Sequence, residues 1–204
     1  MFIFGHLGIG NQIARPWSRG LSTRWILIGT LLPDMIDKIL YYSLSFATGL
    51  HAAELGRSTM IGGTRTFAHT ALFLILITVL AQWRQSRVLA ALSLGIATHL
   101  LLDNVYDRLV FGEVASFSAD AADLSSAFQA LVFPYFGFRF ATIPFQDVSE
   151  HFWSIFGNKA LMGTEVVGMA LLAWHAWKHQ NGRELMTRLR AFRPRSKARR
   201  RKKH

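Results

Sequence analysis

The sequence predicts an all-α integral membrane protein, a polytopic bundle of short or half-spanning helices with one re-entrant or interfacial segment. Two features of the composition support this fold class. Hydrophobic residues make up 51% of the 204 residues and charged residues only 17%, whereas soluble domains carry roughly 25% charged residues. The charges also leave long apolar runs uninterrupted. The alternative is a very hydrophobic soluble helical domain, and the lengths of the runs favour the membrane.

Apolar runs nearly free of charge are expected to supply the helices. A helix needs about 20 mostly apolar residues to cross the hydrocarbon core, with roughly 17 as a lower limit. Two runs are long enough by this measure, 66–83 and 160–177. A third, 88–102, qualifies when it is extended to its polar end. We expect the others, 25–33, 39–53 and 124–138, to be half-buried or interfacial.

A proline-aromatic segment interrupts the run at 124–138. Its sequence, FPYFG over residues 133–137, breaks a helix because proline lacks a backbone N–H and clashes with the preceding turn. Aromatic residues settle at the level of the lipid headgroups. The segment therefore predicts a re-entrant or interfacial turn.

The positive charge lies almost entirely at the C-terminal end. Residues 178–204 contain twelve Lys and Arg and one acid, so their net charge of +11 equals that of the whole chain. Positive segments remain on the cytoplasmic side, as do Arg84 and Arg87 in a tight connection between two runs. We expect a membrane domain at 1–177 and a disordered cytoplasmic tail at 178–204 that contacts anionic lipid headgroups. A third interpretation, a basic nucleic-acid-binding protein, conflicts with the apolar runs, and no specific nucleic acid is expected.

Histidine and carboxylate residues recur within the apolar segments. The chain has no cysteine, so any metal must be held by His, Asp or Glu. Ionisable groups inside apolar segments are costly and are functional candidates. His99 and Asp103 are spaced i, i+4, and Asp34 and Asp37 are spaced i, i+3, so each pair shares a helix face. For the second pair the alternative is charge stabilisation of a helix N-terminus, with Pro33 in its first turn.

The remaining candidates are His6, Arg65 and His69. The topology brings His69 to the same membrane face as His99 and Asp103, at the outer side of the bilayer. Arg65 is suited to neutralising a phosphate, or alternatively serves as an interfacial anchor. The combined set of His and carboxylate side chains is large enough to bind one or two divalent ions. These ligand types suit zinc best, and manganese and iron also accept them.

Three segments resemble a known family in their order. GTLLPDMIDK (29–38), GTRTFAHT (63–70) and THLLLD (98–103) are similar to the membrane-bound metal-dependent hydrolases of the YdjM-like family, which are distantly similar to zinc-dependent phospholipase C. ALVFPYFG (130–137) and EVVG (165–168) resemble the family's later segments. The resemblance implies a bacterial or archaeal inner membrane protein.

The resemblance also implies roles for individual residues. It makes Asp34, His69, His99 and Asp103 metal ligands, and His6 a further ligand. Asp37 becomes a ligand or a base acting from behind the ligands, although many members have Pro-Asp-x-Asp where this chain has Pro-Asp-Met-Ile-Asp. The later His and Glu ligands of the phospholipase have only candidate counterparts, which are Glu150, His151 and Glu165.

The sequence therefore predicts a membrane-bound hydrolase that cleaves a phosphodiester or other ester of a lipid-like substrate. A metal-activated water would attack, Asp37 or Asp34 would accept its proton, and Arg65 would stabilise negative charge. The alternative is a non-enzymatic membrane protein that binds or transports divalent cations. Membrane lipid is the expected partner in both cases.

Overall fold

The computed structural model describes residues 3–50, 52–111, 126–141, 149, 153 and 156–191. Within these ranges all regular secondary structure is helical, which confirms the all-α prediction. The elements are α1 (Ile3–Ala14), the 3-10 turn η1 (Arg15–Trp17), α2 (Thr23–Thr48), α3 (Ala52–Ser58), the 3-10 turn η2 (Phe67–His69), α4 (Ala71–Trp83), α5 (Arg87–Phe111), α6 (Ser126–Leu131) and α8 (Lys159–Ala191).

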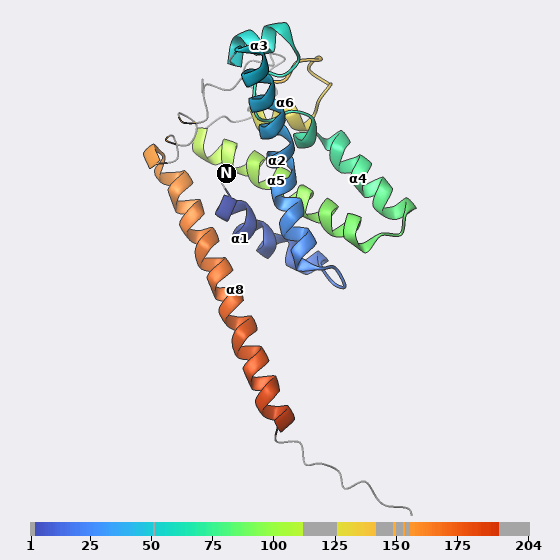
Figure 1. The fold of residues 1–204 in the computed structure, drawn as a ribbon, viewed down its shortest axis with the longest axis vertical. Helices are drawn as coiled ribbons and strands as arrows, with labels where there is room; N and C mark the ends of the chain where they lie inside the picture. The colour runs from blue at the N-terminus through green and yellow to red at the C-terminus, as the bar shows by residue number, and fades with distance from the viewer. Residues whose placement is uncertain are drawn as a thin grey trace, which may run out of the picture.

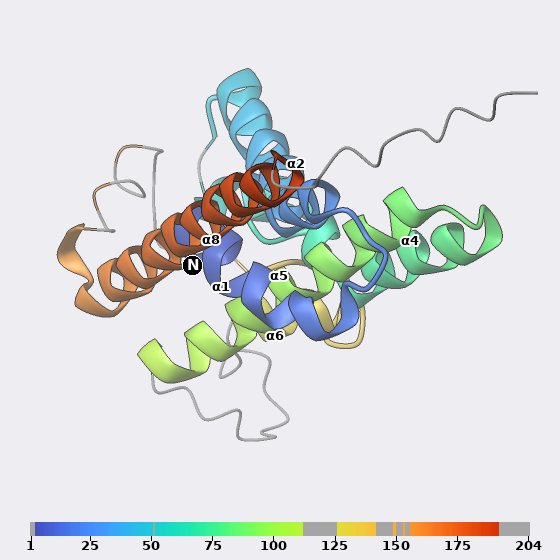
Figure 2. The same cartoon turned by 90° about the horizontal axis from the view of Figure 1, so that it is seen from below.

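Helices α2 and α5 form the centre of the bundle and pack against each other (Figure 1). Helix α4 folds back on α5 as a hairpin, and α1 lies between α8 and the α2–α5 pair. Seen from below, α1 again lies beside α8, and α4 lies at the opposite side of the molecule (Figure 2). The candidate ligands come from α1, α2, η2 and α5, so the packing of these elements determines the site.

Helix α2 joins two apolar runs into one element. The runs 25–33 and 39–53 were expected as distinct segments, with Pro33 in a first helical turn, and this expectation is wrong because Pro33 lies inside a 26-residue helix. The helix continues across the charged residues between the two runs because these residues form ion pairs or hydrogen bonds. Lys38 pairs with Asp34, and Asp37 accepts backbone hydrogen bonds from another segment. Gly49, in the left-handed conformation, ends the helix.

Two glycines allow the backbones of α2 and α5 to touch. A Cβ atom on Gly29 would lie 2.4 Å from the carbonyl oxygen of Leu92, and one on Gly95 would lie 2.2 Å from that of Ile26. Small residues at such crossings are typical of helix packing in membranes. The close approach brings the acidic turn of α2 beside the histidine of α5, one turn beyond Gly95.

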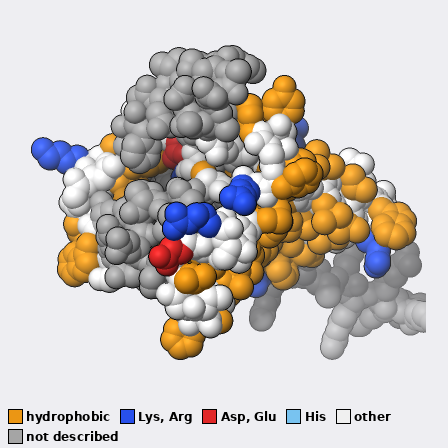
Figure 3. Space-filling view, turned by 90° about the horizontal axis from the view of Figure 1, so that it is seen from above, with side chains coloured by type: hydrophobic (Ala, Val, Ile, Leu, Met, Phe, Trp, Pro, Cys, Tyr) orange, Lys and Arg blue, Asp and Glu red, His pale blue; other side chains and the backbone are white. Residues whose placement is uncertain are grey.

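Among the described residues, one helix segment, Arg87–Leu109 of α5, is long and apolar enough to cross a membrane. Helix α4 is apolar but has only 13 residues, which span about 20 Å at 1.5 Å per residue. Its side chains Leu72, Ile75 and Val79 are each more than half exposed. Hydrophobic side chains cover the side of the molecule on which α4 lies, with few charged groups among them (Figure 3).

The C-terminal helix extends beyond the predicted domain boundary at residue 177. Helix α8 continues to Ala191, so the segment 178–191 is helical where a disordered tail was expected. Its sequence allows this because it contains no proline before residue 194 and includes three Arg, two Leu, one Lys and one Glu, which favour helix. The rest of the predicted tail, 192–204, lies outside the described residues.

The proline-aromatic segment follows α6, which ends at Leu131, two residues before the segment begins. The ring of Phe133 stacks on that of Phe140 with centroids 4.4 Å apart, and Phe140 meets Phe67 edge to face. These contacts attach the turn to η2, which carries His69. Tyr135 and Phe138 point outward and are largely exposed.

We predict that Gly95→Ala lowers the free energy of unfolding by about 1–3 kcal/mol, because the added methyl group must force α5 away from the carbonyl of Ile26. Gly163→Ala on α8 is the matched control, since a Cβ atom added there would have no atom within 4 Å and alanine favours helix over glycine. Chemical denaturation in detergent measures both. Equal stability of the Gly95→Ala protein and the wild type would contradict the contact.

Candidate metal centre

His99 on α5 is held by a main-chain acceptor. Its Nδ1 lies 2.7 Å from the carbonyl oxygen of Thr30 on α2, and the ring is buried. A carbonyl oxygen only accepts hydrogen bonds, so Nδ1 carries a proton. In the neutral ring, Nε2 is therefore the unprotonated nitrogen, and it points into the site.

His69 in η2 is held in the same way by a carboxylate. Its Nδ1 lies 2.7 Å from Oδ2 of Asp37. The same Oδ2 accepts the backbone N–H of Thr66 at 2.7 Å, and Oδ1 of Asp37 accepts that of Ala68 at 3.1 Å. Asp37 is completely buried and fixes both the turn and the ring. A histidine that donates to a carboxylate through one nitrogen presents the other as a ligand.

These two orientations place the Nε2 atoms of His69 and His99 3.1 Å apart. Both are acceptors when the rings are neutral, so their lone pairs face each other at hydrogen-bonding distance. Oδ2 of Asp103 lies 3.7 Å from each Nε2, and Oδ1 of Asp34 lies 3.6 Å from that of His69. With neutral rings, both Nε2 atoms and both of these carboxylate oxygens are acceptors, so the two facing nitrogens require a cation or a shared proton between them.

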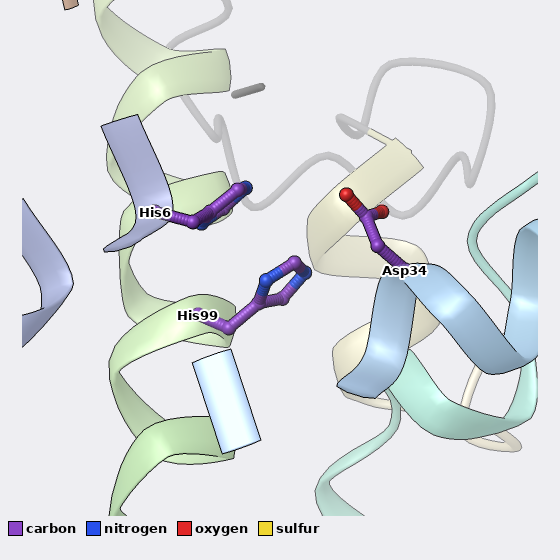
Figure 4. A group of neighbouring side chains, drawn as sticks. All are labelled: His6, Asp34 and His99. Carbon is purple, nitrogen blue, oxygen red and sulfur yellow. The ribbon is translucent and has the colours of Figure 1, made fainter. Parts of the chain in front are cut away.

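His6 on α1 completes the cluster. Its ring stacks on His99 with centroids 4.0 Å apart and an interplanar angle of 19°, and its Nε2 lies 3.2 Å from Oδ1 of Asp103. The ring is fully buried, and within the described residues neither of its nitrogens forms a well-directed hydrogen bond. Figure 4 shows His6, His99 and Asp34 converging from three different helices.

The ligand atoms fall into two groups that share His99. His6, Asp34 and His99 form one, and His69, His99 and Asp103 form the other, with the atoms of each group within 4.8 Å of one another. All five residues predicted from the sequence as metal ligands therefore lie in one cluster. Asp37 is in neither group, because it contacts His69 from behind.

Arg65 lies against the carboxylates of α5. Its Nε donates to Oδ2 of Asp103 at 3.1 Å, and its Nη1 donates to Oδ2 of Asp107 at 2.7 Å and to the hydroxyl of Ser126 at 2.8 Å. Burial opposes the charge of Arg65, but Asp103 and Asp107 outweigh this effect and raise the pKa of the guanidinium. Arg65 thus remains charged and orients Asp103, and its predicted action on substrate charge stays a prediction.

Four residues of the site, Thr30, Lys38, Asp107 and Ser126, were not predicted from the sequence as site residues. Asp107 had a detectable signal, because it follows His99 and Asp103 at the same i+4 interval along one helix face. Thr30 contributes a main-chain atom, so its side chain carried no signal. Of the later candidate ligands, Glu150 and His151 lie outside the described residues. Glu165 lies elsewhere, on α8, where it contacts the start of α1.

A protein-family model described as YdjM inner membrane protein matches residues 1–111, more than half of the chain. The chain belongs to this family. No curated protein and no solved structure matches it. As a YdjM family member it is an inner membrane protein, and the five candidate ligands, Asp37 and Arg65 all lie in the part that matches the family. Helices α6 and α8 lie beyond it.

We predict that Arg65→Met lowers the free energy of unfolding by about 3 kcal/mol, since it leaves the buried carboxylates of Asp103 and Asp107 without their cation. Adding Asp107→Asn should recover part of the loss by removing one of these charges. Denaturation in detergent measures both, with Arg57→Met, at an exposed position, as the control. If Arg65→Met and Arg57→Met unfold alike, the ion pairs do not stabilise the site.

Proposed function

We propose that this YdjM family member is a membrane-bound metal-dependent hydrolase with one or two divalent cations at the His–Asp cluster. The observation that carries this proposal is the pair of Nε2 atoms 3.1 Å apart, both unprotonated in neutral rings whose Nδ1 atoms are committed to Thr30 and Asp37. A metal ion held by His69 and His99 would satisfy both lone pairs, and Asp34 and Asp103 could supply carboxylate oxygens to it.

The charge balance of the site supports a dication. Four carboxylates face two basic side chains within the described site, and these six side chains sum to −2 when the histidines are neutral. This negative charge lies among buried groups, where an uncompensated charge is costly. The carboxylates are those of Asp34, Asp37, Asp103 and Asp107, and the basic side chains are those of Lys38 and Arg65.

The donor set suits zinc. Imidazole nitrogens and carboxylate oxygens without thiolates are typical of catalytic zinc sites, and manganese and iron also accept them. The two ligand groups overlap at His99, whose Nε2 has one lone pair and can bind only one ion, so a second ion would be held by His6 and Asp34 without His99. We propose zinc as the first metal to test.

A bound divalent ion lowers the pKa of a coordinated water and polarises a phosphoryl or carbonyl oxygen. The protein's own residues supply the remaining functions. The Asp34 side chain lies beside Nε2 of His69 and is partly exposed. We therefore propose Asp34 as the group that accepts the water's proton. Asp37 has three donors on its two oxygens, so we propose that it acts through His69, which it holds in one tautomer. Arg65 orients Asp103 and contributes positive charge beside the site.

The proposed substrate is a phosphodiester or another ester of a lipid-like molecule. The exposed apolar side chains of α4 and the outward aromatic residues near Tyr135 would place the cluster close to lipid. We propose a polytopic arrangement in which α4 and part of α8 enter the bilayer with α5, the C-terminus is cytoplasmic and the site faces outward.

A second candidate is a protein that binds or passes divalent cations without turnover. The complete burial of His6 and His99 and the near-complete burial of His69 favour this candidate, because a hydrolase must admit a substrate to its metal. Metal binding is common to both functions, so turnover distinguishes them.

We predict that the purified wild type contains zinc or takes it up, and that His99→Ala loses it, because His99 belongs to both ligand groups. Elemental analysis measures the metal content. His175→Ala on α8, which lies outside both groups, is the matched control. Unchanged metal content in the His99→Ala protein would contradict the metal centre.

We predict that the zinc-loaded wild type hydrolyses at least one member of a panel of phospholipids and phosphodiesters, and that His69→Ala does not. Release of the alcohol or headgroup from mixed micelles measures turnover. The hydrolase proposal would be contradicted if the wild type binds zinc but turns over no substrate. Accumulation of zinc inside vesicles by the same protein would instead support the transport function.

A further inference from the structure

A carboxylate from the other end of the chain caps the first helix. Oε2 of Glu165, on α8, accepts the backbone N–H of Phe4 at 2.8 Å, and Oε1 accepts that of Gly5 at 3.0 Å. The Glu165 side chain is buried. The first N–H groups of a helix lack partners within the helix, and a carboxylate there both satisfies them and complements the helix dipole.

Close backbone contact reinforces this cap. A Cβ atom on Gly168, one turn after Glu165, would lie 2.1 Å from the carbonyl oxygen of Phe4, and one on Gly8 would lie 2.1 Å from the carbonyl oxygen of Gly168. The absence of side chains at both glycines thus lets α1 and α8 touch. Together, the cap and the contact fix the position of α1 and its rotation about its own axis.

The ring of His6 depends on this placement more than the other two histidine rings of the site. Thr30 and Asp37 hold His99 and His69 through Nδ1 contacts of 2.7 Å, whereas the polar neighbour of the His6 ring among the described residues is Oδ1 of Asp103, 3.2 Å from its Nε2 and without a well-directed hydrogen bond. Its position follows from the backbone of α1, which begins one turn before it, and from stacking on His99.

We infer that Glu165 is a positioning residue for His6, and that helix α8 thereby completes the metal centre. This inference rests on the proposed function, in which His6 is a ligand. Both oxygens of Glu165 are used by amides of α1, so it acts through the helix and does not bind the metal itself. The site therefore depends on a part of the chain outside the segment 1–111 that matches the family.

Zinc titration of the full chain in detergent, in competition with a chromophoric chelator, tests this inference. We expect Glu165→Gln, which removes the charge and one acceptor, to weaken zinc binding about tenfold, the lower end of the loss typical of groups that support a ligand. His6→Ala should weaken it at least as much. Adding Glu165→Gln to His6→Ala should cause no further loss, because the positioned ligand is already absent.

Glu54→Gln is the matched control, since Glu54 is exposed on α3, and it should leave zinc affinity unchanged. The absorption spectrum of bound Co²⁺ gives a second readout, in which Glu165→Gln should resemble His6→Ala and differ from wild type. If Glu165→Gln does not fold, Gly168→Ala displaces the same end of α1 and should give the same loss.

Two results would overturn the role of Glu165 alone: wild-type zinc affinity in the Glu165→Gln protein, or a loss that multiplies with that of His6→Ala. Multiplied losses would mean that Glu165 acts independently of His6. A wild type that binds no zinc is a different result, because it removes the metal centre and the proposed function with it.

Discussion

The Nε2 atoms of two histidines face each other across 3.1 Å. In neutral rings both carry a lone pair, so the site needs a cation or a shared proton between them. His69 and His99 belong to separate elements, and each ring is turned inward by an acceptor behind it, the carboxylate of Asp37 or the carbonyl of Thr30. Both acceptors come from α2, so this single helix orients the histidines of η2 and α5. The glycine contact between α2 and α5 makes that possible, because it brings the carbonyl of Thr30 within reach of His99.

Acidic side chains lie next to this pair of nitrogens, and basic side chains pair with the acidic ones. Asp34 and Asp103 lie close to the Nε2 atoms, and Lys38 and Arg65 pair with these carboxylates from the outer side. Arg65 also reaches Asp107 and Ser126, and so links α5 to α6. Electrostatic interactions are strong where water is excluded, so the negative charge of these carboxylates favours the binding of a cation.

Much of the site was predictable from local spacing, and the parts that were not depend on contacts between distant segments. The i, i+4 spacing of His99 and Asp103 placed both on one helix face, and the structure confirms this. The i, i+3 pair Asp34 and Asp37 also shares a helix, but the two carboxylates have different contacts, because Asp37 meets the backbone of η2 while Asp34 lies beside Nε2 of His69. The sequence did not reveal that Pro33 lies within a continuous helix, since a proline equally suits a first turn. The contact of Glu165 with α1 joins residues 160 positions apart and leaves no periodic pattern.

The most direct test of the metal centre is an anomalous-difference map at the zinc absorption edge, from crystals of the zinc-loaded full chain. We expect a peak among the Nε2 atoms of His69 and His99 and the carboxylate of Asp103, with ligand distances of about 2.0–2.2 Å, and a second peak near His6 and Asp34 if the site holds two ions. A map without a peak at the cluster, with the two Nε2 atoms still at hydrogen-bonding distance and bridged by a proton, would contradict the metal centre.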